Sequence, residues 1–180
     1  MDGVISPASP SPHGGAPAAA VRAVVVTVSD RCAAGEAVDS SGPILVAGLR
    51  EAGFAVVDAV VVPDGAASVE RALRAAVDAG AQVVLTTGGT GVGPRDRTPE
   101  GTAPLLELDL PGVAHAVRTS SPAPAAALSR ARAGVTATSE TGARAVVVNL
   151  PGSPRAAVEG LAVVLPILPH LLDQLAGGAH

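Results

Sequence analysis

The residues best suited by type and spacing to bind a ligand or take part in a reaction form one glycine-rich segment. This segment covers residues 86–100 and reads TTGGTGVGPRDRTPE. Glycine lacks a Cβ, so consecutive backbone N–H groups in such a segment can approach an anion and form a concave donor site. The candidate ligands of that anion are Thr87, Gly88, Gly89, Thr90 and Gly91. The segment has neither the lysine of a G-x-x-x-x-G-K-[ST] phosphate loop nor the full dinucleotide pattern G-x-G-x-x-G. The pattern favours a phosphate-binding loop, and a crossover loop that needs glycine only for tight turning is the alternative.

Two aspartates accompany this segment. Asp96 lies within it between Arg95 and Arg97, and Asp64 occupies the loop after the preceding predicted strand. In doubly wound sheets, ligands bind at the carboxyl ends of the strands, so the two carboxylates face one crevice if their strands are neighbours. Two carboxylates beside a phosphate-binding loop suit a divalent cation that bridges nucleotide phosphates. The alternatives are a salt bridge or turn at Asp96 and a helix N-cap at Asp64.

Two more strand-to-helix turns carry candidate binding residues. The first holds Ser29, Asp39, Ser41 and Gly42, and the second holds Pro151, Gly152 and Ser153. Each turn can present hydroxyl groups or backbone N–H groups to an anion at a helix N-terminus. The same residue types are also ordinary helix caps, and the sequence leaves capping and binding open at both turns. Cys32 has no histidine or second cysteine near it in the sequence, so we expect it to have no function.

The elements that must position these turns alternate between strand and helix. Apolar, β-branched runs predict strands at Ala23–Val28, Phe54–Val62 and Ala81–Thr87. Helices are predicted at Pro43–Ala52 and Ser68–Ala79, and the second has Val69, Leu73, Ala76 and Val77 on one face. Apolar runs without polar alternation are typical of strands that are covered on both faces. The pattern predicts a three-layer, doubly wound α/β fold with a mostly parallel sheet.

The second half of the chain is expected to complete this fold. Thr98 and Pro99 resemble an N-cap and a first-turn proline, and predict a helix that runs to about Leu108. Further helices are predicted at Val113–Thr119, at Ala123–Arg132 and from Pro154 onwards, where Pro166 and Pro169 interrupt the last one. Gly134–Thr138 and Arg144–Asn149 are β-prone and flank a polar turn, which predicts a hairpin that gives the sheet an antiparallel edge.

Composition limits the classes of partner. The chain has 180 residues, a net charge of −4, one Phe and no Trp or Tyr. Aromatic platforms for single strands and a basic footprint for duplexes are both missing, so we expect no nucleic-acid partner. Without an 18-residue apolar run or a signal-peptide pattern, and with one cysteine, we expect a cytoplasmic protein without membrane contact. Residues 1–20, rich in Pro, Ser, Gly and Ala, predict a disordered tail before a single domain at residues 21–180.

Six motifs in one order connect the chain to a known family. They are VTVSDR from Val26, DSSGP from Asp39, VVPD ending at Asp64, LTTGGTG followed by RDRTPE, LSR ending at Arg130, and NLPGSP from Asn149. Over about residues 22–175 the sequence resembles the MogA/MoaB family of molybdenum-cofactor proteins. The resemblance implies a molybdopterin-binding α/β fold, a homotrimer, and transfer of the adenylyl group of ATP to the terminal phosphate of molybdopterin with release of pyrophosphate. It also implies Mg²⁺ as the ion and a molybdenum-insertion protein as a partner.

The resemblance carries roles onto particular residues. Asp64 and Asp96 match the two functionally important aspartates of the family, and are the expected catalytic residues and Mg²⁺ ligands. Gly88 to Gly91 match its pterin- and phosphate-binding loop, and Asp39, Ser41 and Pro151 to Ser153 match further pocket segments. A molybdopterin-binding carrier of the same fold, without transferase activity, is the alternative. An unrelated nucleotide- or sugar-phosphate-binding α/β protein is the third hypothesis.

The chain departs from the family pattern at two places. Gly101 stands where the family more often has alanine. Leu108 stands between Glu107 and Asp109, where the family more often has arginine between two acidic residues. The second departure puts a local salt bridge in doubt.

Overall fold

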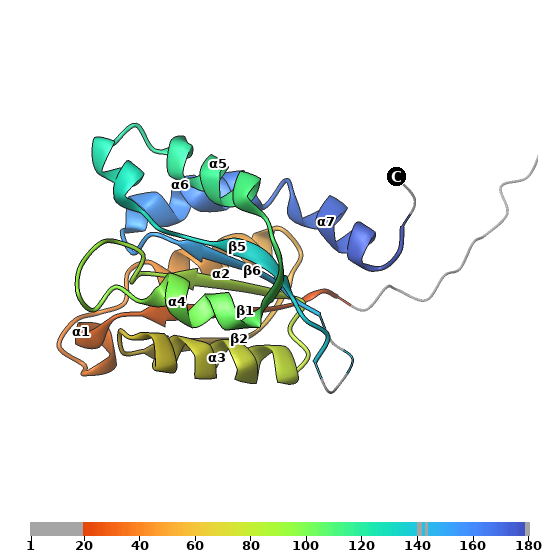
Figure 1. Ribbon diagram of the computed structural model, residues 1–180, viewed down its shortest axis with the longest axis horizontal. Coiled ribbons are helices and arrows are strands. Elements are labelled where there is room, and N and C mark those ends of the chain that lie inside the picture. The colour runs from red at the N-terminus through yellow and green to blue at the C-terminus, as the bar shows by residue number, and fades with distance from the viewer. Residues whose placement is uncertain (1–19, 140–141, 143, 179–180) are drawn as a thin grey trace, which may run out of the picture.

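Figure 1 shows a sheet between two layers of helices in the computed structural model, which describes residues 20–139, 142 and 144–178. The six strands run in the order β2-β1-β3-β6-β5-β4. They are β1 (Arg22–Val28), β2 (Ala55–Val62), β3 (Val83–Thr87), β4 (Leu106–Asp109), β5 (Ala133–Thr136) and β6 (Val146–Leu150). Strands β2, β1, β3 and β6 are parallel neighbours, which confirms the three-layer, mostly parallel prediction. The predicted tail lies outside the described residues, apart from Ala20.

The helices lie where the sequence pattern predicts, apart from one short addition and the two departures after Thr102 and Pro122 described below. They are α1 (Asp30–Ala33), α2 (Gly42–Glu51), α3 (Ala66–Asp78), α4 (Thr98–Thr102), α5 (Pro111–Ser120), α6 (Pro154–Val164) and α7 (Leu168–Leu175). Helix α1 is the addition, within the first polar loop. In the described part of the chain, no single helix is long and apolar enough to cross a membrane. Helices α6 and α7 pass that test only as a pair, which is bent by 53° at its break.

The central strands are buried on both faces because the helices cover both. All of β3 and β6 are buried, as is β1 beyond Arg22. On one face, Val25 shares a core cluster with Leu45 of α2 and Leu161 of α6. On the other face, Val26 shares a cluster with Leu73 of α3. Each such side chain stabilises the fold by about 1.5–3 kcal/mol relative to exposure. This packing therefore holds the carboxyl ends of the strands in fixed positions.

The predicted helix from Thr98 to Leu108 is wrong beyond its first turns. Helix α4 ends at Thr102, a 3-10 turn spans Ala103–Leu105, and β4 follows. Strand β4 pairs antiparallel with β5, so its backbone groups are satisfied by a neighbour that propensity along the chain does not reveal. Strand β5 is antiparallel to β6, which confirms the hairpin pairing, although β4 and not the hairpin forms the edge of the sheet. The hairpin turn lies partly outside the described residues.

The predicted helix at Ala123–Arg132 is also wrong. Only a 3-10 segment forms, at Pro124–Leu128, with i to i+3 bonds from Ala126 N to Ala123 O and from Ser129 N to Ala126 O. Pro122 and Pro124 lack backbone N–H groups, and the next backbone donor, Arg130 N, bonds to Thr90 O outside the segment. A long-range contact therefore replaces the helical bond.

The acidic residues around Leu108 retain partners. Glu107 forms an ion pair with Arg144 at 2.6 Å, and Asp109 forms one with Arg132 at 2.7 Å. Both arginines come from the segments around β5 and β6. The absence of an arginine at position 108 therefore leaves both neighbouring carboxylates paired across the sheet.

Candidate functional site

Most of the predicted site residues meet in one cavity at the carboxyl ends of β1, β2, β3 and β6. This cavity, called here the aspartate cavity, has a volume of about 300 Å³. Its predicted members are Ser29, Asp39, Ser41, Asp64, Thr87, Gly88, Gly89, Asp96 and Gly152. Asp64 and Asp96 therefore line the same cavity, as expected for neighbouring strand ends. Cys32 lines it as well.

The other predicted residues divide between two places. Thr90, Gly91, Pro151 and Ser153 line a second cavity of about 270 Å³, together with Ser120, Ser121 and Ser129, and we call it the serine cavity. Gly42 lies instead at a depression between α2 and β2. Because the glycine-rich segment and the Pro151–Ser153 turn each line both cavities, these two loops form the boundary between them.

The glycine-rich segment is held in a conformation that only glycine adopts easily. Gly88 has φ +101° and Gly89 has φ +63°. A Cβ on Gly88 would lie 2.2 Å from the carbonyl oxygen of Val28. Thr98 fixes the loop from the helix side, since its N–H donates to Gly89 O at 3.0 Å and its Oγ1 donates to Gly88 O at 2.8 Å.

This conformation leaves backbone donors available. The N–H groups of Gly89, Thr90 and Gly91 donate to no other group in the described part of the chain, whereas Gly88 N donates to Leu150 O at 3.0 Å. Consecutive free amides in a turn that begins with two glycines of positive φ are the arrangement of an anion-binding nest. The amides of Gly89–Gly91 are thus available to an anion, as the phosphate-binding prediction requires, and the same geometry is compatible with a loop that needs glycine for tight turning.

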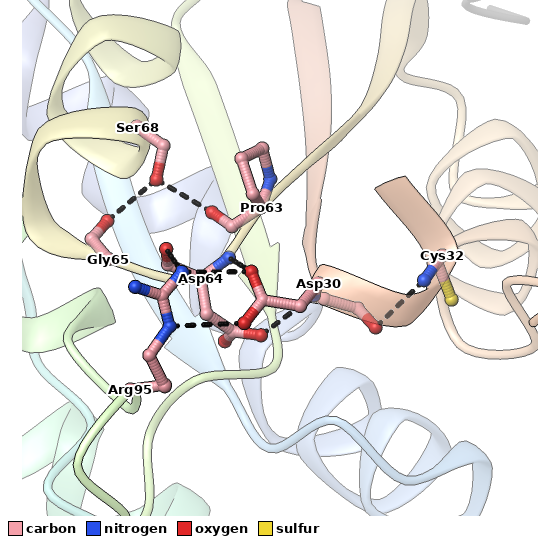
Figure 2. Close-up of polar contacts among 8 residues, drawn as sticks. Asp30, Cys32, Pro63, Asp64, Gly65, Ser68 and Arg95 are labelled. Carbon is pink, nitrogen blue, oxygen red and sulfur yellow. Dashed lines mark hydrogen bonds and ion pairs between the residues drawn. The ribbon is translucent and has the colours of Figure 1, made fainter. Parts of the chain in front are cut away.

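Asp64 is held by a reciprocal pair of contacts with Asp30, shown in Figure 2. Asp30 N donates to Asp64 Oδ2 at 2.8 Å, and Asp64 N donates to Asp30 Oδ1 at 3.0 Å. Arg95 donates to both Asp30 oxygens at 3.0 and 3.1 Å and to the backbone oxygen of Asp64 at 2.8 Å. The Arg95 guanidinium holds the pKa of Asp30 below its usual range. The N-cap alternative for Asp64 is wrong, because Gly65 is the N-cap residue of α3.

Asp96 is held by its own loop. Its Oδ2 accepts from Gly93 N at 2.9 Å. A Cβ on Gly91 or Gly93 would come within 2.9 or 2.8 Å of that oxygen, so the two glycines make room for the carboxylate. Asp64 Oδ1 and Asp96 Oδ1 have no hydrogen-bond donor within the described part of the chain. Each aspartate therefore combines one anchored oxygen with one that is available to a ligand.

Several residues for which the sequence left capping and binding open make local structural contacts. Asp39 accepts from Thr27 Oγ1 at 2.7 Å, Ser41 N at 3.1 Å and Gly42 N at 2.9 Å, so its carboxylate orders the start of α2. Ser29 caps α1 and Ser153 caps α6 through their Oγ atoms. Thr87 Oγ1 donates to Pro151 O at 2.9 Å and ties the two boundary loops together.

The acidic pair fits Mg²⁺ in one particular way. Among the described residues, no group of three or more His, Cys, Asp or Glu side chains is arranged to hold a metal ion. Mg²⁺, however, commonly binds one or two carboxylates together with substrate phosphates and water. The two available oxygens of Asp64 and Asp96, beside unpaired amides for phosphate, match that ligand set.

Comparison with known proteins decides the family. Residues 24–170 match the sequence model of a family described as a probable molybdopterin binding domain. The chain belongs to this family. The matched region contains all described strands apart from the first two residues of β1. It also contains the residues that line both cavities, so the match covers the whole candidate site.

Individual relatives are similar over most of the chain. The molybdopterin adenylyltransferase of Pyrococcus furiosus is 41% identical over 151 residues, which are 82% of this chain and 87% of that protein. The molybdenum cofactor biosynthesis bifunctional protein of Synechococcus elongatus is 40% identical over 90% of this chain, which spans about half (50%) of that relative's length. The solved structure of the molybdopterin biosynthesis Mog protein from Mycobacterium ulcerans has a TM-score of 0.80 and 38% identity, and the match covers 89% of this chain and 99% of that one.

Proposed function

We propose that this protein transfers the adenylyl group of ATP to the terminal phosphate of molybdopterin. An oxygen of that phosphate attacks the α-phosphorus of ATP and forms the new P–O bond. The bond from the α-phosphorus to the oxygen bridging to the β-phosphorus breaks, and pyrophosphate leaves with that oxygen. The observation that carries the proposal is the pair of available oxygens on Asp64 and Asp96 in one cavity, bordered by unpaired loop amides. The name of the similar Pyrococcus furiosus protein supports it.

The chain's own residues would act mainly by alignment. Phosphoryl-type transfer requires two anions held in line and their charge neutralised, with little covalent work from the protein. The N–H groups of Gly89, Thr90 and Gly91 would bind phosphate oxygens, and the N-terminus of α6, capped by Ser153, adds a favourable dipole. Donors that are fixed before the substrate arrives cost little reorganisation during the reaction.

Asp64 and Asp96 would hold Mg²⁺ through the oxygens that no protein group occupies. When bound, the ion supplies charge neutralisation for the phosphates. The anchored oxygens, which accept from Asp30 N and Gly93 N, keep both carboxylates oriented toward the cavity. A homotrimer, a cytoplasmic location and delivery of the product to a molybdenum-insertion protein remain predictions that accompany this proposal.

The experiment is an anaerobic reaction of the purified protein with molybdopterin, ATP and Mg²⁺, in which pyrophosphate and adenylylated pterin are both quantified. Asp64→Asn and Asp96→Asn should each reduce product formation by at least 10²-fold, since one misplaced or missing charge can cost that much. Asp78→Asn is the matched control, because Asp78 is exposed at the far end of α3. Molybdopterin binding without product from the wild-type protein would establish the carrier alternative, and absence of both would refute the proposal.

A further inference from the structure

Arg130 makes more contacts to the glycine-rich segment than any role in surface charge requires. Its Nε donates to Gly91 O at 2.7 Å, and its Nη2 donates to Asp96 O at 2.5 Å. Its Nη1 forms an ion pair with Glu100 at the start of α4. Its backbone N also donates to Thr90 O at 2.8 Å. One residue therefore binds the segment at four points, although it lies 34 positions from Asp96 in the chain.

The contacts are placed at both ends of the turn that presents Asp96. Inside that turn, Gly93 N donates to Asp96 Oδ2 and Asp96 N donates to Gly93 O at 3.1 Å. The guanidinium joins the backbone oxygens of Gly91 and Asp96, so it fixes the distance across the turn. Both oxygens accept no other hydrogen bond in the described part of the chain. Without the guanidinium, the width of the turn would depend on the local Gly93–Asp96 contacts alone.

We propose that Arg130 is a positioning residue, whose guanidinium sets the place of the Asp96 carboxylate, while its backbone N–H holds the peptide that carries the Gly91 amide. The inference rests on the proposed transferase function for its catalytic consequence, but its structural part can be tested on the protein without substrates. Arg130 touches neither cavity as a lining residue, so it acts through the loop and not on the substrates.

The geometry requires arginine specifically. A guanidinium presents five N–H donors in a rigid fork, whereas a lysine ammonium is a compact charge on a flexible chain. The three acceptors lie on Gly91, Asp96 and Glu100, which come from different parts of the segment. A lysine retains the attraction to Glu100, but it cannot hold the two backbone oxygens at a fixed separation. Arg130→Lys therefore separates loss of charge from loss of geometry.

Arg132 offers a matched control two positions further on. Its side chain is 37% exposed against 36% for Arg130, and it also pairs with a carboxylate, that of Asp109. Within the described residues its guanidinium bonds to Asp109 on β4 and not to the glycine-rich segment. Arg132→Met thus removes an arginine ion pair of similar exposure without touching the loop.

The test measures amide hydrogen exchange by NMR in the substrate-free protein. The decisive amide is Gly93 N–H, because it donates to Asp96 Oδ2 and so reports the position of the carboxylate. In Arg130→Met, we expect Gly93 exchange to accelerate at least tenfold, with a smaller acceleration in Arg130→Lys and none in Arg132→Met. If Arg130→Met does not fold, the comparison of Arg130→Lys with Arg132→Met decides. Unchanged Gly93 exchange in the folded variants would overturn the inference, whatever their activity.

The catalytic consequence has its own readout. We expect Arg130→Lys to lower kcat for adenylyl transfer at least tenfold, to raise the Mg²⁺ concentration for half-maximal rate, and to leave the urea midpoint equal to that of Arg132→Met. Accelerated Gly93 exchange with wild-type kcat and Mg²⁺ dependence would overturn positioning as a functional role. A wild-type protein without transferase activity would refute the proposed function separately, and the exchange comparison would still decide the structural part.

Discussion

Replacement of Gly88 by alanine tests how the glycine-rich segment approaches β1. Gly88 has φ +101°, and a left-handed conformation costs a residue with a Cβ about 1–2 kcal/mol. A Cβ there would also lie 2.2 Å from Val28 O and 3.3 Å from Val28 C. Both atoms are backbone at the end of β1, so relief requires a shift of about 1 Å between the loop and the strand. Overpacking of this kind costs about 1–3 kcal/mol.

Gly53 supplies the control for the backbone contribution. It has φ +88°, close to that of Gly88, but a Cβ on Gly53 would meet nothing within 4 Å. We therefore expect Gly53→Ala to lower the free energy of unfolding by about 1–2 kcal/mol and Gly88→Ala by about 2–5 kcal/mol. Urea titration followed by circular dichroism is the assay, because the chain has no Trp or Tyr for fluorescence.

The difference between these two variants isolates the contact with Val28. Free energies of unfolding that agree within about 0.5 kcal/mol would refute the close approach, because the conformational cost is common to both. The Gly88→Ala protein should also bind ATP and Mg²⁺ more weakly, since the shift displaces the neighbouring Gly89 amide. Gly53→Ala should bind them as the wild-type protein does.

Three further predictions concern buried contacts and charge. Asn149→Ala removes an amide that bonds two buried threonine hydroxyls and one backbone N–H, so we expect the urea-derived stability to fall by about 2–4 kcal/mol. Gly101→Ala places a Cβ 2.5 Å from Ala66 O, and should cost about 1–3 kcal/mol in the same titration. Arginine partners lower the pKa of Asp30 and Glu100 in the folded protein, so the stabilisation from both is complete above about pH 5 and is lost progressively as the pH falls through the lowered values, which urea midpoints from pH 7 to pH 3 will measure.

Each of these outcomes can fail in a distinct way. A neutral Asn149→Ala substitution would mean that water replaces the amide, and a stabilising Gly101→Ala substitution would mean that α3 and α4 separate easily. Gly101 is informative because alanine is the commoner family residue there. For the pH dependence, Arg95→Met should remove the part of the acid-induced loss of stability that is due to Asp30. If the urea midpoints of that variant fall with pH as those of the wild-type protein do, the attribution to Asp30 is contradicted.

The parts of the fold that the sequence predicts are those specified by local pattern. Strands β1 and β3 are β-branched runs, and α3 has one apolar face, so burial and periodicity agree along the chain. Strand β4 has only four residues, LELD, with two charges, and it exists because β5 lies beside it. The alanine-rich segment after Pro122 has high helix propensity, yet its prolines and the Arg130 N–H contact to Thr90 O prevent a helix. Pairing between distant segments decided both failures.

The candidate site shows the same distinction between local pattern and contacts between distant segments. The glycine-rich segment and the two aspartates could be recognised from residue type and their place after strands. The residues that orient them could not be recognised, because the contacts are distant in sequence. Asp30 contacts Asp64, which is 34 positions away, and Arg95, which is 65 positions away. Arg130 belongs to the LSR motif that contributed to the family resemblance, so a signal existed, but the motif does not reveal which backbone oxygens the guanidinium binds. Residue type and motif order were enough to nominate the candidate site residues, whereas the contacts that position them required the fold.

The charge of the aspartate cavity explains why a divalent cation belongs to the proposal. Asp39, Asp64 and Asp96 line the cavity, and no arginine or histidine is among its described lining residues. All 12 cationic residues of the chain are arginines, and Arg95 and Arg130, which contact the site loops, already bind Asp30 and Glu100. Backbone amides carry only partial charges, so a polyphosphate would meet net repulsion from the carboxylates. A divalent cation held by Asp64 and Asp96 would offset that repulsion, so we expect removal of Mg²⁺ to abolish nucleotide binding and not only to slow the transfer step.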